Sequence, residues 1–201
     1  MTVVIDRRTL VFGLASAGIP CAAWAERDWP ARLAAAAQGQ VGRTVVYDPA
    51  YVRLAYPGGD VPRERGVCTD VVVRAYRDAF GVDLQKLVHE DMRANFAAYP
   101  KTWGLRKPDR NIDHRRVPNL ETFFRRKGAA LRFRSPADFQ PGDLATQRLP
   151  GNLPHIVVVT GRRATSGRYL CVHNVGRGAQ LEDVLASWPL VGRFRYAPPG
   201  G

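Results

Sequence analysis

The sequence predicts one α+β domain in which helices come first along the chain and an antiparallel sheet follows. Apolar residues recur at helical spacing in the first two thirds of the chain, whereas the last third carries short apolar runs between turn residues. With 201 residues, the chain is long enough for one well-buried core. Because it has no internal repeat and no long linker, we expect residues 26–201 to form a single domain.

The expected helices begin at residues that cap helices well and end at glycine or proline. Asp28 precedes Pro30 and an alanine-rich stretch, which is typical of a first helical turn. Cys68 opens a segment with helical apolar spacing that Gly81 closes. The predicted helices are residues 28–40, 68–80, 83–98 and 120–127, the last one capped by Asn119.

Short runs of β-branched and aromatic residues predict the strands. A polar stretch rich in proline, aspartate and arginine, residues 101–117, separates the helical part from the sheet and is expected to be a loop. An earlier extended run covers residues 44–47. The predicted strands of the sheet are residues 144–148, 156–160, 169–174 and 193–196.

The N-terminus has the layout of a secretory signal. Arg7 and Arg8 precede an apolar stretch at residues 10–20, and small residues then favour cleavage after Ala25. The arginine pair also resembles a twin-arginine export motif, so both export routes stay open. We therefore expect residues 1–25 to be a signal peptide and the protein to be periplasmic or secreted. No run reaches the length of about 20 apolar residues that crossing a bilayer requires, which predicts no integral membrane segment.

The chain is strongly basic, with a formal net charge of +12 and a pI near 10.3. A positive surface favours an anionic partner, although a solvated basic surface explains the same charge. The basic residues are spread in pairs without a zinc-finger, helix-turn-helix or RNA-recognition signature, which argues against nucleic acid. We expect a monomer.

Cys68 is placed for nucleophilic chemistry. A thiol in the first turn of a helix lies at the positive end of the helix dipole, near unpaired backbone N–H groups that favour the thiolate and can hold an oxyanion. Asp70 suits the same turn as a dipole partner. Such a cysteine needs a base, and His155 starts an apolar strand while His173 lies late in the next one. In an antiparallel pair these positions are neighbours, so His173 can orient His155.

Other interpretations of the same residues remain open. Cys68 and Cys171 can form a disulfide in an oxidising compartment, although we expect Cys171 to be a packed free thiol. The two cysteines and two histidines are also zinc ligands by type, but they lack the close spacing that marks a zinc site. His114 and Asp113 are a rival pair that we instead expect in an ion-pair network of the loop.

In order along the chain, several motifs resemble the NlpC/P60 hydrolases. They are Tyr56, Gly58-Gly59, Cys68-Thr69, Pro141-Gly142-Asp143-Leu144, His155-Ile156-Val157-Val158 and Val172-His173-Asn174. More narrowly, Arg65 to Asp70, Asn111 to Asn119 and Leu153 to His155 look like the exported DUF1287 family. Val67 and Asp70 depart from the NlpC/P60 pattern, which usually has aspartate and glycine there.

The resemblance implies a papain-like fold and a thiol hydrolase, a cysteine peptidase or amidase that cleaves an amide bond in anionic cell-wall peptidoglycan without a cofactor or metal. Its catalytic residues would be Cys68, His155 and His173. Two alternatives are a non-catalytic wall-binding module and an acyltransferase or lipid-directed thiol enzyme on the same fold. The expected substrate-binding residues are Tyr56, Thr69, Asp70 and Asn174.

Overall fold

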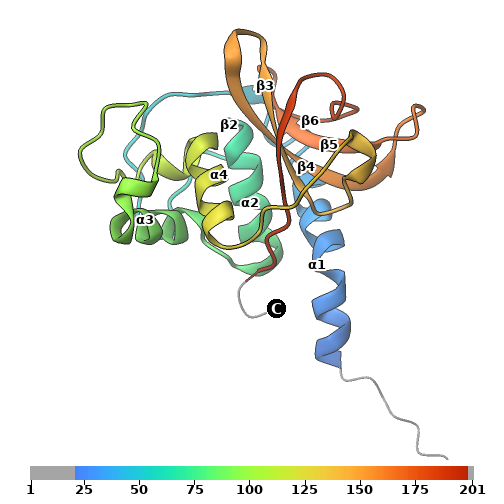
Figure 1. The fold of residues 1–201 in the computed structure, drawn as a ribbon, viewed down its shortest axis with the longest axis horizontal. Helices are drawn as coiled ribbons and strands as arrows, with labels where there is room; N and C mark the ends of the chain where they lie inside the picture. The colour runs from blue at the N-terminus through green and yellow to red at the C-terminus, as the bar shows by residue number, and fades with distance from the viewer. Residues whose placement is uncertain (1–20, 199–201) are drawn as a thin grey trace, which may run out of the picture.

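In a computed structural model, residues 21–198 are described, and they form helices packed beside a five-stranded antiparallel sheet. Figure 1 shows α2, α3 and α4 gathered on one side of the molecule and α1 extending away below the sheet. The α-helices are α1 (Cys21–Gln38), α2 (Cys68–Phe80), α3 (Leu84–Ala94) and α4 (Val117–Arg126). The order of helices first and sheet second confirms the predicted α+β class.

The sheet has the strand order β6-β5-β4-β3-β7, and all of its neighbouring strands are antiparallel. Its strands are β3 (Leu144–Leu149), β4 (Leu153–Arg163), β5 (Tyr169–Asn174), β6 (Ala179–Glu182) and β7 (Leu190–Phe194). Of these, β6 was missed by the sequence analysis, because its four residues follow two closely spaced glycines and resemble a turn. A separate parallel pair joins β1 (Val46–Tyr47) to β2 (Arg65–Gly66).

The helix boundaries agree with the sequence patterns to within two residues except at three ends. Helix α1 begins at Cys21, so the predicted start at Asp28 was wrong, and Pro30 lies inside the helix at the cost of one backbone hydrogen bond. Helix α3 ends at Ala94 and a 3₁₀ turn follows at Phe96–Ala98. Helix α4 starts ahead of Asn119, whose side-chain amide donates to the Asp113 carbonyl instead of capping the helix.

The expected loop 101–117 contains a 3₁₀ turn at Asp113–Arg115. Two more 3₁₀ turns, Pro136–Asp138 and Pro150–Asn152, flank strand β3. These short turns change the direction of the chain between the regular elements.

The core lies on both faces of the sheet. On one face, Ile156, Val158 and Val172 are buried in the same cluster as the apolar residues of α2. On the other face, Val157 and Cys171 belong to a second cluster, because successive residues of a strand point to opposite faces. Cys171 is a fully buried free thiol, as predicted.

Among residues 21–198, every helix is too short or too polar to span a lipid bilayer. The predicted export segment falls mostly outside the described residues, since Arg7, Arg8 and the apolar stretch precede Cys21.

Candidate functional site

Helix α2 begins at Cys68, so the expected position of this thiol in a first helical turn is confirmed. The residue before it, Val67, is extended, and its backbone N–H donates to the Asp70 carboxylate over 2.7 Å. That bond satisfies a backbone donor at the helix start and fixes how the chain enters the helix. Cys68 is 6% exposed.

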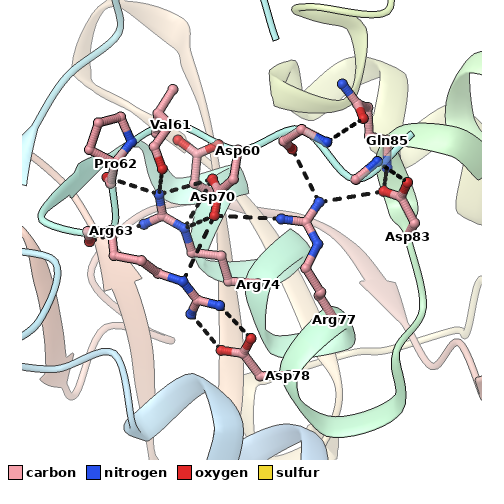
Figure 2. Close-up of polar contacts among 12 residues, drawn as sticks. Asp60, Val61, Pro62, Arg63, Asp70, Arg74, Arg77, Asp78, Asp83 and Gln85 are labelled. Carbon is pink, nitrogen blue, oxygen red and sulfur yellow. Dashed lines mark hydrogen bonds and ion pairs between the residues drawn. The ribbon is translucent and has the colours of Figure 1, made fainter. Parts of the chain in front are cut away.

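The loop before Cys68 is held by a fully buried arginine of the same helix, Arg74. Its guanidinium forms an ion pair with Asp60 at 2.9 Å, and Figure 2 shows it at the centre of the contacts that tie this loop to α2. A buried cation is tolerated only when its N–H groups are paired, and here several backbone carbonyls complete the set. They are the carbonyls of Val61, Pro62, Arg63 and Arg65.

A second buried ion pair fixes the start of α2 from the other side. Arg115, in the 3₁₀ turn before α4, pairs with Asp70 at 2.9 Å, and both side chains are almost completely buried. The hydroxyl of Thr69 donates to the Arg115 carbonyl over 3.0 Å. The polar atoms of Thr69 and Asp70 thus make contacts inside the protein, and these contacts hold the start of α2.

A cavity of about 190 Å³ opens beside Cys68. Apolar walls come from Val117 and Pro154, while Arg115 and Arg116 line its polar side. The guanidinium of Arg116 lies 4.3 Å from the centre of the Trp103 ring. The walls thus combine apolar surface with two guanidinium groups that are already paired with Asp70 and Asp113.

His155 and His173 are brought together, as the strand pairing predicted. His155 Nε2 lies 3.0 Å from His173 Nδ1, and His173 Nε2 lies 2.9 Å from a Glu182 carboxylate oxygen. Glu182 is paired in turn with Arg177. The Trp188 ring packs against both imidazoles. These contacts fix the orientation of the His155 ring through a chain of polar groups that ends in a carboxylate.

The sulfur of Cys68 faces strand β4 at the backbone N–H of Ile156, the residue that follows His155. Within residues 21–198, no hydrogen bond joins this sulfur to either imidazole. Cys68 belongs to the cluster on the α2 face, whereas Trp188, which contacts His155, packs against the cluster on the other face. The thiol and the proposed base therefore lie at the same end of β4, but they are not hydrogen-bonded to each other in this conformation.

Burial keeps both groups neutral at physiological pH. It raises the pKa of the Cys68 thiol to about 11, and the N–H groups of Ile156 and Thr69 offset this only in part. Burial and the nearby His173 lower the pKa of His155 to about 3. The resting pair is a thiol and an imidazole, so nucleophilic attack from this site requires proton transfer during the reaction, not a preformed ion pair.

The remaining expected site residues are Tyr56 and Asn174. Tyr56 does not line the Cys68 cavity; its ring packs edge-on against His89, 5.2 Å away. Tyr47 lines the cavity in its place. Asn174 is buried, and its side-chain amide donates to the Gly66 carbonyl over 2.8 Å, so this residue holds the loop before Cys68.

Sequence reasoning missed Tyr47, Glu182 and Trp188. Tyr47 lies in an extended run that the sequence did reveal, but its pairing with β2 depends on a long-range contact. Glu182 lies opposite Cys171 in the strand that was not predicted. An alternation of polar and apolar residues over residues 179–182 was the one available signal.

Neither a disulfide nor a metal site is present among the residues that the structure describes. Cys68 and Cys171 are both free, and no group of three or more histidine, cysteine, aspartate or glutamate side chains is arranged to hold an ion. His114, the rival base, is buried, and its neighbour Asp113 pairs with Arg116 at 3.2 Å in the expected loop network.

Comparison with known proteins gives a family but no activity. The model of the family described as "Domain of unknown function (DUF1287)" matches residues 34–196. The uncharacterized protein YijF of Escherichia coli strain K12 is 57% identical over 165 residues, which cover 82% of this chain and 80% of that protein. Among solved structures, NlpC1 of Trichomonas vaginalis matches with a TM-score of 0.45 and 13% identity. That match covers 83% of this chain and 44% of NlpC1, so the chain spans less than half of its length.

Proposed function

Because this chain belongs to the DUF1287 family, whose description assigns no function, we propose from its site that it is a thiol hydrolase that cleaves an amide bond. The observation that carries this proposal is that both groups lie at one end of β4, the sulfur at the Ile156 backbone and the imidazole on the preceding residue. Cys68 approaches from the start of α2, and a His155–His173–Glu182 chain is aligned on the neighbouring strands.

In the proposed reaction, His155 accepts the thiol proton of Cys68, and the sulfur attacks the carbonyl carbon of the substrate. Backbone N–H groups at the start of α2 hold the oxyanion. The tetrahedral intermediate collapses to a thioester as His155 protonates the leaving amine, and water then releases the acid and restores the thiol. Since the resting imidazole binds protons weakly, the carboxylate of Glu182 supports the positive charge through His173.

The papain-like arrangement and the cell-wall substrate are parts of the same proposal. A nucleophile helix against an antiparallel sheet supports the former, and the strongly basic chain supports an anionic peptidoglycan substrate. Export by the signal at residues 1–25 would bring the enzyme to that substrate. Cell fractionation, with the N-terminal mass of the exported protein, tests this part, and a cytoplasmic protein that retains residue 1 contradicts it.

The decisive experiment is digestion of purified sacculi by the wild type and by Cys68→Ala, with mass analysis of the released fragments. Cys171→Ala is the matched control, because it removes the other buried thiol. We expect release by the wild type and the control and none by Cys68→Ala. Release that survives in Cys68→Ala would disprove the assigned nucleophile.

Glu182 is a positioning residue in this scheme, and Glu182→Gln tests it. Weakening its charge-assisted hydrogen bond by about 1.5 kcal/mol corresponds to a roughly tenfold lower kcat with little change in KM. Asp183→Asn is the neighbouring control, because the Asp183 carboxylate accepts its hydrogen bonds from Ser166 and Arg168. Equal losses in both variants would indicate a structural role only.

A second function, a wall-binding module without turnover, is favoured by two observations. The missing hydrogen bond between Cys68 and His155 and the high pKa of the thiol describe a site that is not activated at rest. The sacculus experiment separates the two functions, because this module would sediment with sacculi in both wild-type and Cys68→Ala forms and release no fragment from either.

A further inference from the structure

A second concavity carries four exposed cations. It is lined by the segment around Tyr51, by His89 of α3 and by the loop 104–111. We call this surface the basic basin and define it by its cations, Arg53, Arg106, Lys107 and Arg110.

The cations of the basic basin lack a carboxylate partner in the part of the chain that the structure describes. Among residues 21–198, none of the four forms an ion pair with a carboxylate. The acidic residue in the concavity, Asp109, accepts hydrogen bonds from the Tyr51 hydroxyl at 3.0 Å and from the Asn111 backbone at 2.9 Å. Elsewhere arginines such as Arg63 and Arg74 are matched to aspartates. The basin therefore holds positive charge that the fold does not neutralise.

The state of His89 agrees with a positive potential in the basin. Burial lowers the pKa of His89, and the nearby cations Arg93 and Arg110 lower it further. The guanidinium of Arg110 also lies 5.5 Å from the centre of the Tyr56 ring. Tyr51, which lines the basin, offers a bound chain apolar contact beside the cations.

The basic basin is continuous along the chain with the Cys68 cavity. Trp103 and Ile112, the residues on either side of the loop, line the Cys68 cavity, while the loop between them lines the basin. The same segment of the chain therefore borders both concavities.

We propose that the basic basin binds an acidic peptide chain through its carboxylates, as the continuation of the peptide whose amide bond lies at Cys68. Guanidinium and ammonium groups bind carboxylates through charge-assisted hydrogen bonds. The position of the scissile bond rests on the proposed function, but the binding of acidic peptide to the basin does not. The inference names the substrate class as peptides with several free carboxylates.

Binding is measured with the full chain carrying Cys68→Ala, which cannot turn over, by fluorescence anisotropy of labelled oligo-glutamate and of oligo-glutamine of equal length. The test variant adds Arg106→Gln and Lys107→Gln, both in the basin. The matched control adds Arg132→Gln and Arg162→Gln, two exposed cations that lie in the sheet part of the chain, and so removes the same net charge.

We expect oligo-glutamate to bind more tightly than oligo-glutamine, and the basin variant to weaken its binding about tenfold, since two exposed ionic contacts are lost. The control should stay within about twofold, and added salt should weaken the wild-type interaction. Equal weakening in both variants would overturn the basin as the site, and tighter binding of inorganic polyphosphate of the same charge would overturn the carboxylate ligand. Because no turnover occurs in this assay, a failed sacculus digestion leaves its result unaffected.

Discussion

The buried ion pair between Asp70 and Arg115 predicts a large loss of stability on Asp70→Asn. The pair is 2.9 Å long, with side chains 4% and 2% exposed, so water cannot compensate a lost charge. The asparagine can still accept the Val67 N–H, but its amide N–H₂ cannot accept from the guanidinium. Breaking a buried pair from one side costs about 3–5 kcal/mol because the remaining ion is left uncompensated.

The retained Val67 bond places the expected cost at the low end, about 3 kcal/mol. For a chain of this size that corresponds to a fall in Tm of roughly 6–12 °C. Differential scanning calorimetry and urea unfolding at neutral pH measure both quantities. The matched control is Glu90→Gln, which breaks the exposed pair with Lys86 and should cost less than about 1 kcal/mol. A Tm of Asp70→Asn as high as that of the control would refute the assignment of a buried, uncompensated arginine.

Three further predictions follow from burial and backbone conformation. The rate of Cys68 alkylation should be low at pH 7 and rise about tenfold per pH unit toward about pH 11. Cys171 should react more slowly still, because it is fully buried. A plateau in the Cys68 rate near pH 7 would reveal a preformed thiolate. Burial lowers the pKa of His114 from 6.5 to about 4, so between these values the unfolded state binds more protons and the free energy of unfolding falls by about 1.4 kcal/mol per unit as the pH drops. His114→Gln should lack this contribution, and an unchanged difference in urea-unfolding free energy between pH 7 and pH 5 would contradict it. Gly142→Ala should lower the free energy of unfolding by at least about 2 kcal/mol in the same assay, because φ is 83° and a Cβ would lie 2.5 Å from Pro30 of α1. Gly161→Ala is the control, since a Cβ there has no atom within 4 Å, and equal losses in both variants would argue against the steric cause.

Local patterns in the sequence were sufficient to predict the elements that carry the site. The helix at Cys68 and the strand at Tyr169–Asn174 were predicted with the bounds that the structure has. Both signals are local, since apolar periodicity and a closing glycine act within a few residues. The adjacency of His155 and His173 also followed, because antiparallel pairing of consecutive strands places the start of one beside the end of the next.

The polar partners of the site could not be predicted in this way. Asp70 was expected to act as a helix-dipole partner and to contact substrate, yet it is matched to Arg115, 45 residues away. Tyr56 was expected to bind substrate from the family resemblance, but the cavity is lined by Tyr47. Which side chains meet depends on how distant segments pack, and the cost of burying a charge without its partner then selects the pairs.

The amino-acid sequence by itself thus determined the class of the fold, the helix start at Cys68 and the strands that bear the two histidines, because capping and periodicity are properties of short segments. Only the tertiary structure decided that Glu182 ends the histidine chain, that burial keeps the thiol and the imidazole neutral, and that four cations of distant segments share one concavity. Desolvation and ion pairing depend on the atoms around each group, and those surroundings exist only once the chain has folded.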